Sequence, residues 1–132
     1  GSKDDDTANG RIYAAAGYIT LCYSVRGHGL SPGGSTIMST GEREDLAGVL
    51  DYMRTIPGID TNAVGISGGS QGGLHGLWAI ADRLPVKAVS SDVIVPHWAT
   101  DMLMNGSVRR TVVNLLKSSR VSYDPVRDIY WD

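Results

Sequence analysis

Several features that would point to particular classes of protein are absent from this sequence. It has a single cysteine, Cys22, so neither an intrachain disulfide nor a cysteine-based metal site can form. No run of about 18 apolar residues is present, so no membrane-spanning segment is expected. The net charge is −2 and there is no basic stripe, which argues against a nucleic-acid partner. No metal-ligand cluster or organic-cofactor motif is recognisable, and we expect neither a metal nor a cofactor.

What is present is the composition of one small globular domain. The chain has 132 residues, of which 42% are hydrophobic and 20% are charged. Ten of its 17 glycines lie at residues 27–34 and 65–76. Such clusters mark places where the backbone turns sharply or approaches another group closely. The sequence provides no basis for assigning a cellular location.

Hydrophobic periodicity predicts strands that alternate with helices. The expected strands are 18–25, 63–67 and 86–90. The first expected helix lies at 9–16, after a polar lead-in. A second follows the capping box formed by Ser39 and Glu42, and two more are expected at 74–81 and 108–116. This alternation is typical of an α/β protein, and we expect a three-layer α/β/α parallel sheet. Residues 123–132 show no clear period.

The second glycine cluster contains overlapping Gly-x-Ser-x-Gly motifs centred on Ser67 and Ser70. In this motif the serine lies on a strained strand-to-helix turn, and the flanking glycines avoid steric clashes. A nucleophile at Ser67 would put many glycines into the first turns of the helix, where each costs about 1 kcal/mol relative to alanine. A nucleophile at Ser70 extends the strand to Gly68 and leaves fewer glycines in the helix. We therefore predict that Ser70 is the nucleophile.

A turn that binds a ligand phosphate is the alternative interpretation of the same cluster, because helix N-termini bind anions. However, neither the dinucleotide-binding spacing Gly-x-Gly-x-x-Gly nor the phosphate-binding spacing Gly-x-x-x-x-Gly-Lys occurs. A serine placed between a predicted strand and a predicted helix favours the catalytic interpretation.

Two segments carry a family resemblance. Residues 26–31, Arg-Gly-His-Gly-Leu-Ser, resemble the Arg-Gly-x-Gly-x-Ser loop of α/β-hydrolases. Residues 64–73 resemble the nucleophile elbow of the cocaine-esterase-like and X-prolyl dipeptidyl peptidase group. The resemblance implies that Ser70 is the nucleophile and that the backbone N–H of Gln71 is one oxyanion-hole donor. It also implies a structural ion pair between Arg26 and an acid on the next helix, for which Asp45 is the candidate.

The sequence contains one candidate histidine and one candidate acid as catalytic partners of the serine. A serine hydroxyl needs a histidine that takes its proton and an acid that orients the histidine, and in this superfamily the order is serine, acid, histidine. His97 is the only histidine that fits this order, and Asp92 is the candidate acid in a variant arrangement. We expect His28 to have a loop role and His75, on the helix after Ser70, to be packed or solvated.

In the superfamily's sheet, a strand that comes earlier in the sequence lies in space between the two strands expected here at 18–25 and 63–67. We therefore expect an incomplete α/β-hydrolase core. Residues 1–92 would be its central part with the nucleophile elbow, and residues 93–132 the start of a cap or lid, or a C-terminal extension. Four apolar residues could line a pocket or simply pack against the sheet: Trp98, Met102, Leu103 and Met104.

The leading functional hypothesis is a serine hydrolase that cleaves a small ester or a peptide through an acyl-enzyme, with this chain inactive alone as a fragment. A non-catalytic, hydrolase-like module is the second hypothesis. The third is an oligomeric assembly in which another chain supplies the missing strand and histidine.

Overall fold

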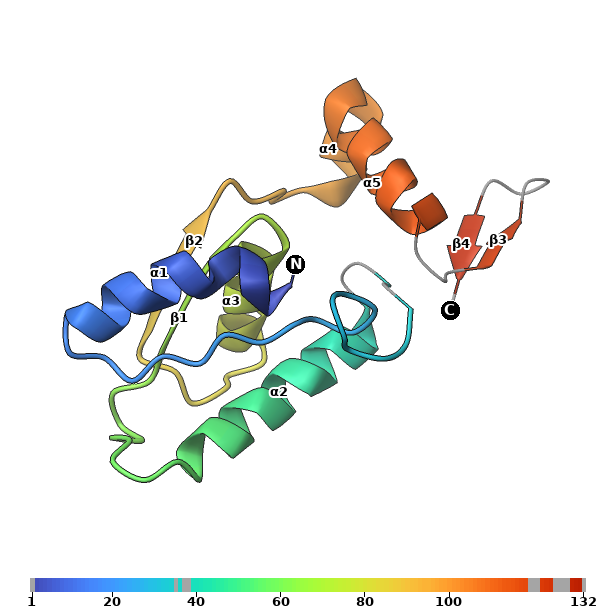
Figure 1. Ribbon diagram of the computed structural model, residues 1–132. Coiled ribbons are helices and arrows are strands. Elements are labelled where there is room, and N and C mark those ends of the chain that lie inside the picture. Colours follow the sequence, from blue (N-terminus) through green and yellow to red (C-terminus); the bar gives the residue numbers. More distant parts are fainter. Residues whose placement is uncertain (1, 35, 37–38, 119–121, 125–128, 132) are drawn as a thin grey trace.

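The computed structural model describes residues 2–34, 36, 39–118, 122–124 and 129–131 (Figure 1). The elements follow one another along the chain as α1 (Lys3–Ala15), α2 (Thr40–Arg54), β1 (Gly65–Gly69), α3 (Gln71–Ala81), β2 (Ala88–Asp92), α4 (Trp98–Met104), α5 (Gly106–Ser118), β3 (Ser122–Asp124) and β4 (Ile129–Trp131). Among these described residues, no helix has both the length and the apolar character needed to cross a membrane.

The strands β1 and β2 pair in parallel, with Gly65 opposite Ala88 and Gly69 opposite Asp92. Both strands therefore end at the same edge of the sheet, and α3 connects them as a crossover helix. This arrangement confirms the predicted α/β class and two of the predicted strands, each displaced by a few residues. A separate antiparallel pair, β3 and β4, lies at the C-terminal end of the chain.

Helix α3 lies very close to the sheet because its glycines have no side chain. A Cβ atom at Gly76 would be 2.6 Å from Cγ1 of Val89 and 3.6 Å from Cγ2 of Ile66. A Cβ atom at Gly73 would be 2.6 Å from Cγ2 of Ile94. This close packing was expected from the small residues that follow Ser70.

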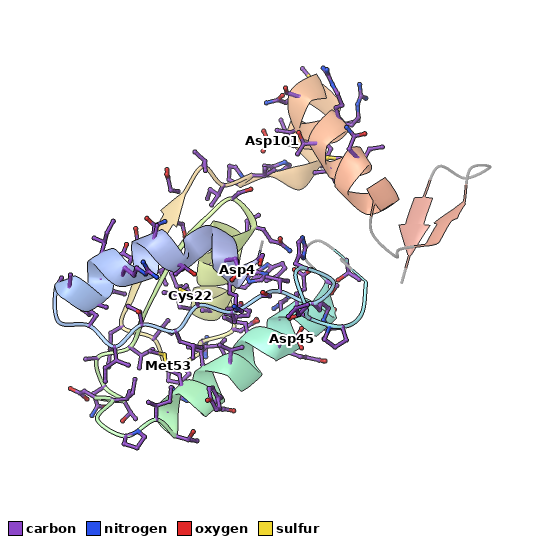
Figure 2. The ribbon with its side chains drawn as sticks, viewed as in Figure 1. Asp4, Cys22, Asp45, Met53 and Asp101 are labelled. Atoms are coloured by element: carbon purple, nitrogen blue, oxygen red, sulfur yellow. The ribbon has the colours of Figure 1, made fainter. Side chains whose placement is uncertain are left out.

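The apolar core lies where α2 and α3 meet the start of β1. Its buried members are Leu46, Leu50, Val64 and Ala79, with five partly buried side chains packed around them, those of Met53, Ile59, Ile66, Leu84 and Val86. Helix α2 begins as predicted, since Ser39 Oγ accepts a hydrogen bond of 3.2 Å from the backbone N–H of Glu42. Figure 2 shows Met53 at the end of α2 that is far from this cap.

Helix α1 begins at Lys3 instead of at residue 9, so the polar lead-in is itself helical. Acidic residues such as Asp4 are favourable in a first helical turn because of the helix dipole. The helix contacts the segment that follows it, where Thr20 Oγ1 donates a hydrogen bond of 3.1 Å to the carbonyl of Gly10. Cys22 lies beside the same glycine (Figure 2).

The prediction of a strand at 18–25 is wrong. This segment runs without regular structure between α1 and the turn at Arg26, and it joins no β-ladder within the described part of the chain. Its attachments are hydrogen bonds of individual side chains, such as the bond of 3.0 Å from the backbone N–H of Lys3 to Ser24 Oγ. A β-branched, aromatic sequence favours extended backbone, but only a paired neighbour turns extended backbone into a strand.

The region after Pro96 is more regular than predicted. The expected helix at 108–116 is present as α5, whereas α4 and the pair β3–β4 were not predicted. Helix α4 is capped at its N-terminal end by His97, whose Nδ1 accepts a hydrogen bond of 3.2 Å from the N–H of Thr100. Histidine is not among the residues that usually signal a helix start, and strands as short as β3 and β4 carry no readable period.

The close approach of α3 to β2 can be tested by replacing glycines. Gly76→Ala should lower the free energy of unfolding by about 1–2 kcal/mol, because its methyl group meets the stiff side chain of Val89. Gly48→Ala in α2 is the matched control, since a Cβ atom at Gly48 would have nothing within 4 Å of it. That control should raise the free energy of unfolding by about 0.5–1 kcal/mol through helix propensity alone. Urea unfolding followed by circular dichroism measures both, and a stabilised Gly76→Ala variant would contradict the close packing.

An ion pair joins α2 to the C-terminal end of α3. Arg43 Nε donates to Oδ2 of Asp82 at 2.9 Å, with a second contact between the Arg43 guanidinium and Oδ1. The hydrogen bond to Arg43 lowers the pKa of Asp82 below its ordinary value. The Arg43 guanidinium also lies 5.7 Å from the ring centroid of Trp78.

The sign of this pKa shift gives a pH prediction. The contribution of Asp82 to stability should be fully present above its unfolded-state pKa of about 4. It should disappear as the pH falls through the lowered folded-state pKa. The difference in melting temperature between wild type and Asp82→Asn should therefore shrink on acidification from pH 6. A difference that grows in acid would contradict the direction of the shift.

Candidate active site

Ser70 lies at the turn that connects β1 to α3, with a strained backbone. Its φ is 52° and its ψ is −117°, a backbone conformation that residues other than glycine rarely adopt. The turn is fastened to the neighbouring strand, since the N–H of Ser70 donates a hydrogen bond of 2.9 Å to the carbonyl of Asp92. The carbonyl of Ser70 accepts one of 3.2 Å from the N–H of Leu74, which continues α3.

The glycine two residues before Ser70 is required by sterics, whereas a Cβ atom at Gly72 would have nothing within 4 Å of it. A Cβ atom at Gly68 would be 2.5 Å from the carbonyl carbon of Gly72 and 2.7 Å from its oxygen. The backbone two residues before the serine therefore touches the backbone two residues after it. The spacing Gly-x-Ser-x-Gly around Ser70 matches this contact.

The two overlapping motifs differ in their surroundings. Ser67 lies inside β1, and its Oγ is 2.9 Å from the hydroxyl of Tyr13 on α1. Ser70 is exposed, and its side chain does not cap α3. Both serines are exposed, and the hydroxyl of Ser70 is the one placed at the strand-to-helix turn, whereas that of Ser67 is hydrogen-bonded to Tyr13.

Gln71 is the first residue of α3 and is half-buried. The first N–H groups of a helix point out of its N-terminal end and carry partial positive charge. The backbone N–H of Gln71 belongs to this set and directly follows Ser70. Negative charge that develops beside Ser70 would be stabilised there.

A buried polar network lies behind this turn, and the sequence did not reveal it. Glu42 is fully buried, with 0% of its surface exposed, and His75 is 3% exposed. Glu42 Oε2 is 2.9 Å from Nε2 of Gln71 and 3.1 Å from Nε2 of His75. The hydroxyl of Thr36 lies 3.2 Å from Glu42 Oε1. We call these residues, together with Tyr23, the Glu42 network.

Tyr23 completes the network on the far side of the imidazole. Its hydroxyl is 3.0 Å from Nδ1 of His75. Burial raises the pKa of Tyr23 to about 12, with smaller contributions from the carboxylates of Glu42 and Asp45, so the hydroxyl keeps its proton. It can therefore donate to Nδ1 while Nε2–H donates to Glu42. His75 is thus packed, as expected, between Tyr23 and the ring of Trp78.

The two candidate partners of Ser70 lie in different settings. Asp92 is the last residue of β2, and its carbonyl contacts Ser70, but its carboxylate accepts a hydrogen bond of 2.9 Å from the N–H of Val93. His97 caps α4. Among the described residues, no histidine is hydrogen-bonded to Ser70. His75 is bonded to Tyr23 and Glu42, and the Nδ1 atom of His28 lies 3.2 Å from the carbonyl of Arg26.

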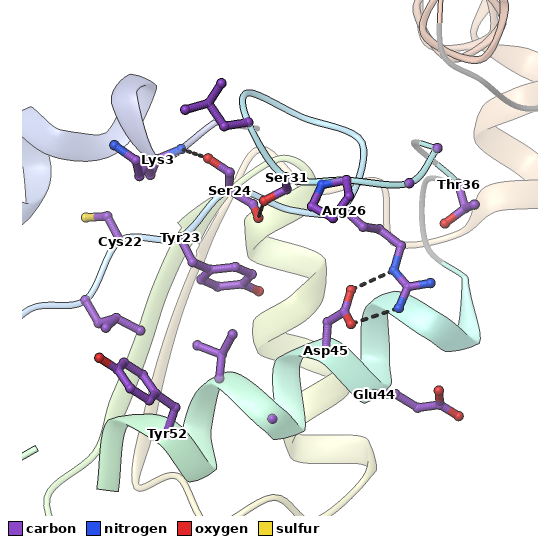
Figure 3. A pocket seen from close by; sticks show the side chains of 17 residues that line it. Lys3, Cys22, Tyr23, Ser24, Arg26, Ser31, Thr36, Glu44, Asp45 and Tyr52 are labelled. Carbon is purple, nitrogen blue, oxygen red and sulfur yellow. Dashed lines mark hydrogen bonds and ion pairs between the residues drawn. The ribbon is translucent and has the colours of Figure 1, made fainter. Parts of the chain in front are cut away.

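The expected ion pair between Arg26 and Asp45 is present and bidentate. Its two hydrogen bonds measure 2.6 and 2.8 Å (Figure 3). The hydrogen bond to Asp45 raises the pKa of Arg26. A third bond, of 3.0 Å, reaches the carbonyl of Gly41, so Arg26 ties its glycine-rich loop to the first turn of α2.

Figure 3 shows a pocket between this loop, α2 and the segment 21–26, with Lys3 at its rim. Ser70 and Gln71 are not among its lining residues. In the part of the chain that the structure describes, no group of three or more His, Cys, Asp or Glu residues is arranged to hold a metal ion.

The apolar residues expected to line or pack at 98–104 are open to solvent where they are described. Leu103 is 74% exposed and Met104 is 82% exposed, whereas Met102 is half-buried. The side chain of Trp98 lies outside the described residues. Leu103 and Met104 are therefore not packed against the sheet.

Comparison with known proteins agrees with the family resemblance. Neither the curated proteins nor the solved structures that were compared gave a match. The family model of X-Pro dipeptidyl-peptidase (S15 family) matches residues 1–124, which include both glycine clusters, the Glu42 network and Ser70. This family consists of peptidases with the α/β-hydrolase fold, so the match supports hydrolase-type chemistry. The chain belongs to the S15 family of X-Pro dipeptidyl-peptidases.

Proposed function

We propose that this chain carries the nucleophile and one oxyanion donor of a serine hydrolase. Ser70 Oγ would attack the carbonyl carbon of an ester or peptide, giving a tetrahedral intermediate and then an acyl-enzyme that water hydrolyses. The N–H of Gln71 would stabilise the oxyanion of the intermediate. The observation that carries the proposal is the exposed hydroxyl of Ser70 on a strained turn at the carboxyl ends of β1 and β2.

The general base is proposed to come from a further segment of the protein. The attack on the substrate requires a histidine that takes the proton of Ser70 and returns it to the leaving group. His28, His75 and His97 each have other hydrogen-bonding partners. Asp92 remains the candidate acid, because its backbone adjoins Ser70.

We also propose that the sheet is part of a three-layer core. Helix α3 packs on the face of β1 that carries Ile66, and Tyr13 of α1 contacts Ser67, whose side chain points to the opposite face. A further strand between β1 and the segment 18–25 could pair with both, and that segment would then become a strand of the sheet. Residues 93–132 would then be the start of a cap or lid over the site, or a C-terminal extension.

The substrate class is proposed from the family. An X-Pro dipeptidyl-peptidase cleaves after a proline in the second position of a peptide, and small esters share the same acyl chemistry. A non-catalytic module is the second candidate function. It is favoured by the absence of a histidine bonded to Ser70 among the described residues.

A fluorophosphonate probe tests the nucleophile in the full-length protein that contains this sequence. The probe should label wild type and should not label Ser70→Ala. Ser67→Ala is the matched control, because it removes the serine of the overlapping motif, and it should still be labelled. Labelling that persists in Ser70→Ala, or is absent from wild type, would contradict the proposal.

The isolated chain of 132 residues should show negligible turnover of a p-nitrophenyl ester, since no histidine in the described part of the chain is bonded to Ser70. Light scattering on the same sample distinguishes a monomer from an assembly that completes the site with another copy. Ser70-dependent turnover by a monomer would show that the required histidine lies within this sequence.

A further inference from the structure

One carboxylate reaches across from α2 and holds the first turn of α3. Gln71 and His75 are four residues apart, so their side chains lie on the same face of α3. Oε2 of Glu42 accepts from both, at 2.9 and 3.1 Å. Glu42 itself lies in the first turn of α2, where the helix dipole favours a negative charge. The starts of the two helices are therefore joined at a single oxygen atom.

Packing of α2 against α3 does not require a charged side chain at position 42. Burying a carboxylate is costly unless it is fully hydrogen-bonded, and apolar side chains of similar size hold helices together at least as well. What a carboxylate adds is direction, because hydrogen bonds fix the orientation of the groups that donate them. The group oriented here is the side chain of Gln71, the residue that follows Ser70.

The strained backbone makes such orientation necessary. A φ of 52° at Ser70 persists only where the surroundings fix it, and relaxation would rotate the peptide group between Ser70 and Gln71. That peptide group carries the N–H assigned to the oxyanion. The hydrogen bond of Ser70 to Asp92 holds the peptide group before the serine, and the Glu42 network holds the residue after it.

We propose that Glu42 is a positioning residue that acts through the side chain of Gln71 to keep the N–H of Gln71 aimed at the oxyanion. The proposal rests on Ser70 being the nucleophile. Oxyanion donors work only when they are preorganised, and small displacements of a catalytic group lose much of the rate. The effect should therefore appear in kcat, with KM little changed, because the contact matters in the transition state.

The experiment compares variants of the full-length protein on a p-nitrophenyl ester, with rates expressed per fluorophosphonate-titrated site. Counting active sites removes any unfolded fraction from the rate. Gln71→Ala keeps the backbone N–H and the bond between Glu42 and His75, and we expect its kcat to fall about tenfold with KM within about twofold. Glu42→Gln keeps an oxygen acceptor, so its kcat should fall less, by about threefold.

Asp82→Asn is the matched control, because it breaks the other polar link between the same two helices, at the opposite end of α3. It should change the melting temperature and leave kcat per titrated site unchanged. A kcat for Gln71→Ala within twofold of wild type would overturn the proposal and leave Ser70 as nucleophile. Activity that survives in Ser70→Ala would instead overturn the proposed function itself.

Discussion

The positive φ of Ser70 is the constraint on which the rest of this structure depends. Such a conformation costs a side-chain-bearing residue about 1–3 kcal/mol, so its surroundings must compensate. They do so on three sides: the backbone contact of Gly68 with Gly72, the hydrogen bond to Asp92, and the continuation of α3 through Leu74. Gly68 is therefore required by contact distances and not by a need for chain flexibility.

Helices α2 and α3 are joined by interactions of three different kinds. Burial of the apolar core supplies most of the stabilisation, at about 25 cal/mol per Å² of apolar surface removed from water. The exposed pair of Arg43 and Asp82 adds little, as surface ion pairs generally do. The carboxylate of Glu42 differs from both, because it is fully buried and its hydrogen bonds must compensate for the loss of water.

The features that could be predicted from the sequence are those that short segments determine by themselves. The strand, turn and helix around Ser70 follow from glycine spacing and local periodicity, and the pair of Arg26 with Asp45 followed from the family resemblance. The strand at 18–25 was predicted wrongly because a strand depends on its neighbour as much as on its own residues. Glu42 was interpreted only as a capping residue, because its burial arises from contacts with Gln71 and His75, about thirty positions away.

Sharing one acceptor oxygen between two donors has an evolutionary consequence. Positions 42, 71 and 75 are not expected to vary independently, because an apolar residue at any one of them removes a hydrogen-bond partner from a buried group of the network. Relatives should therefore either keep an acid, an amide and an imidazole together or exchange the whole set for hydrocarbon side chains. Tyr23 would follow the imidazole, since its hydroxyl loses its acceptor when the ring is lost. Substitution patterns in the family would then be correlated at four positions that are widely separated in the chain.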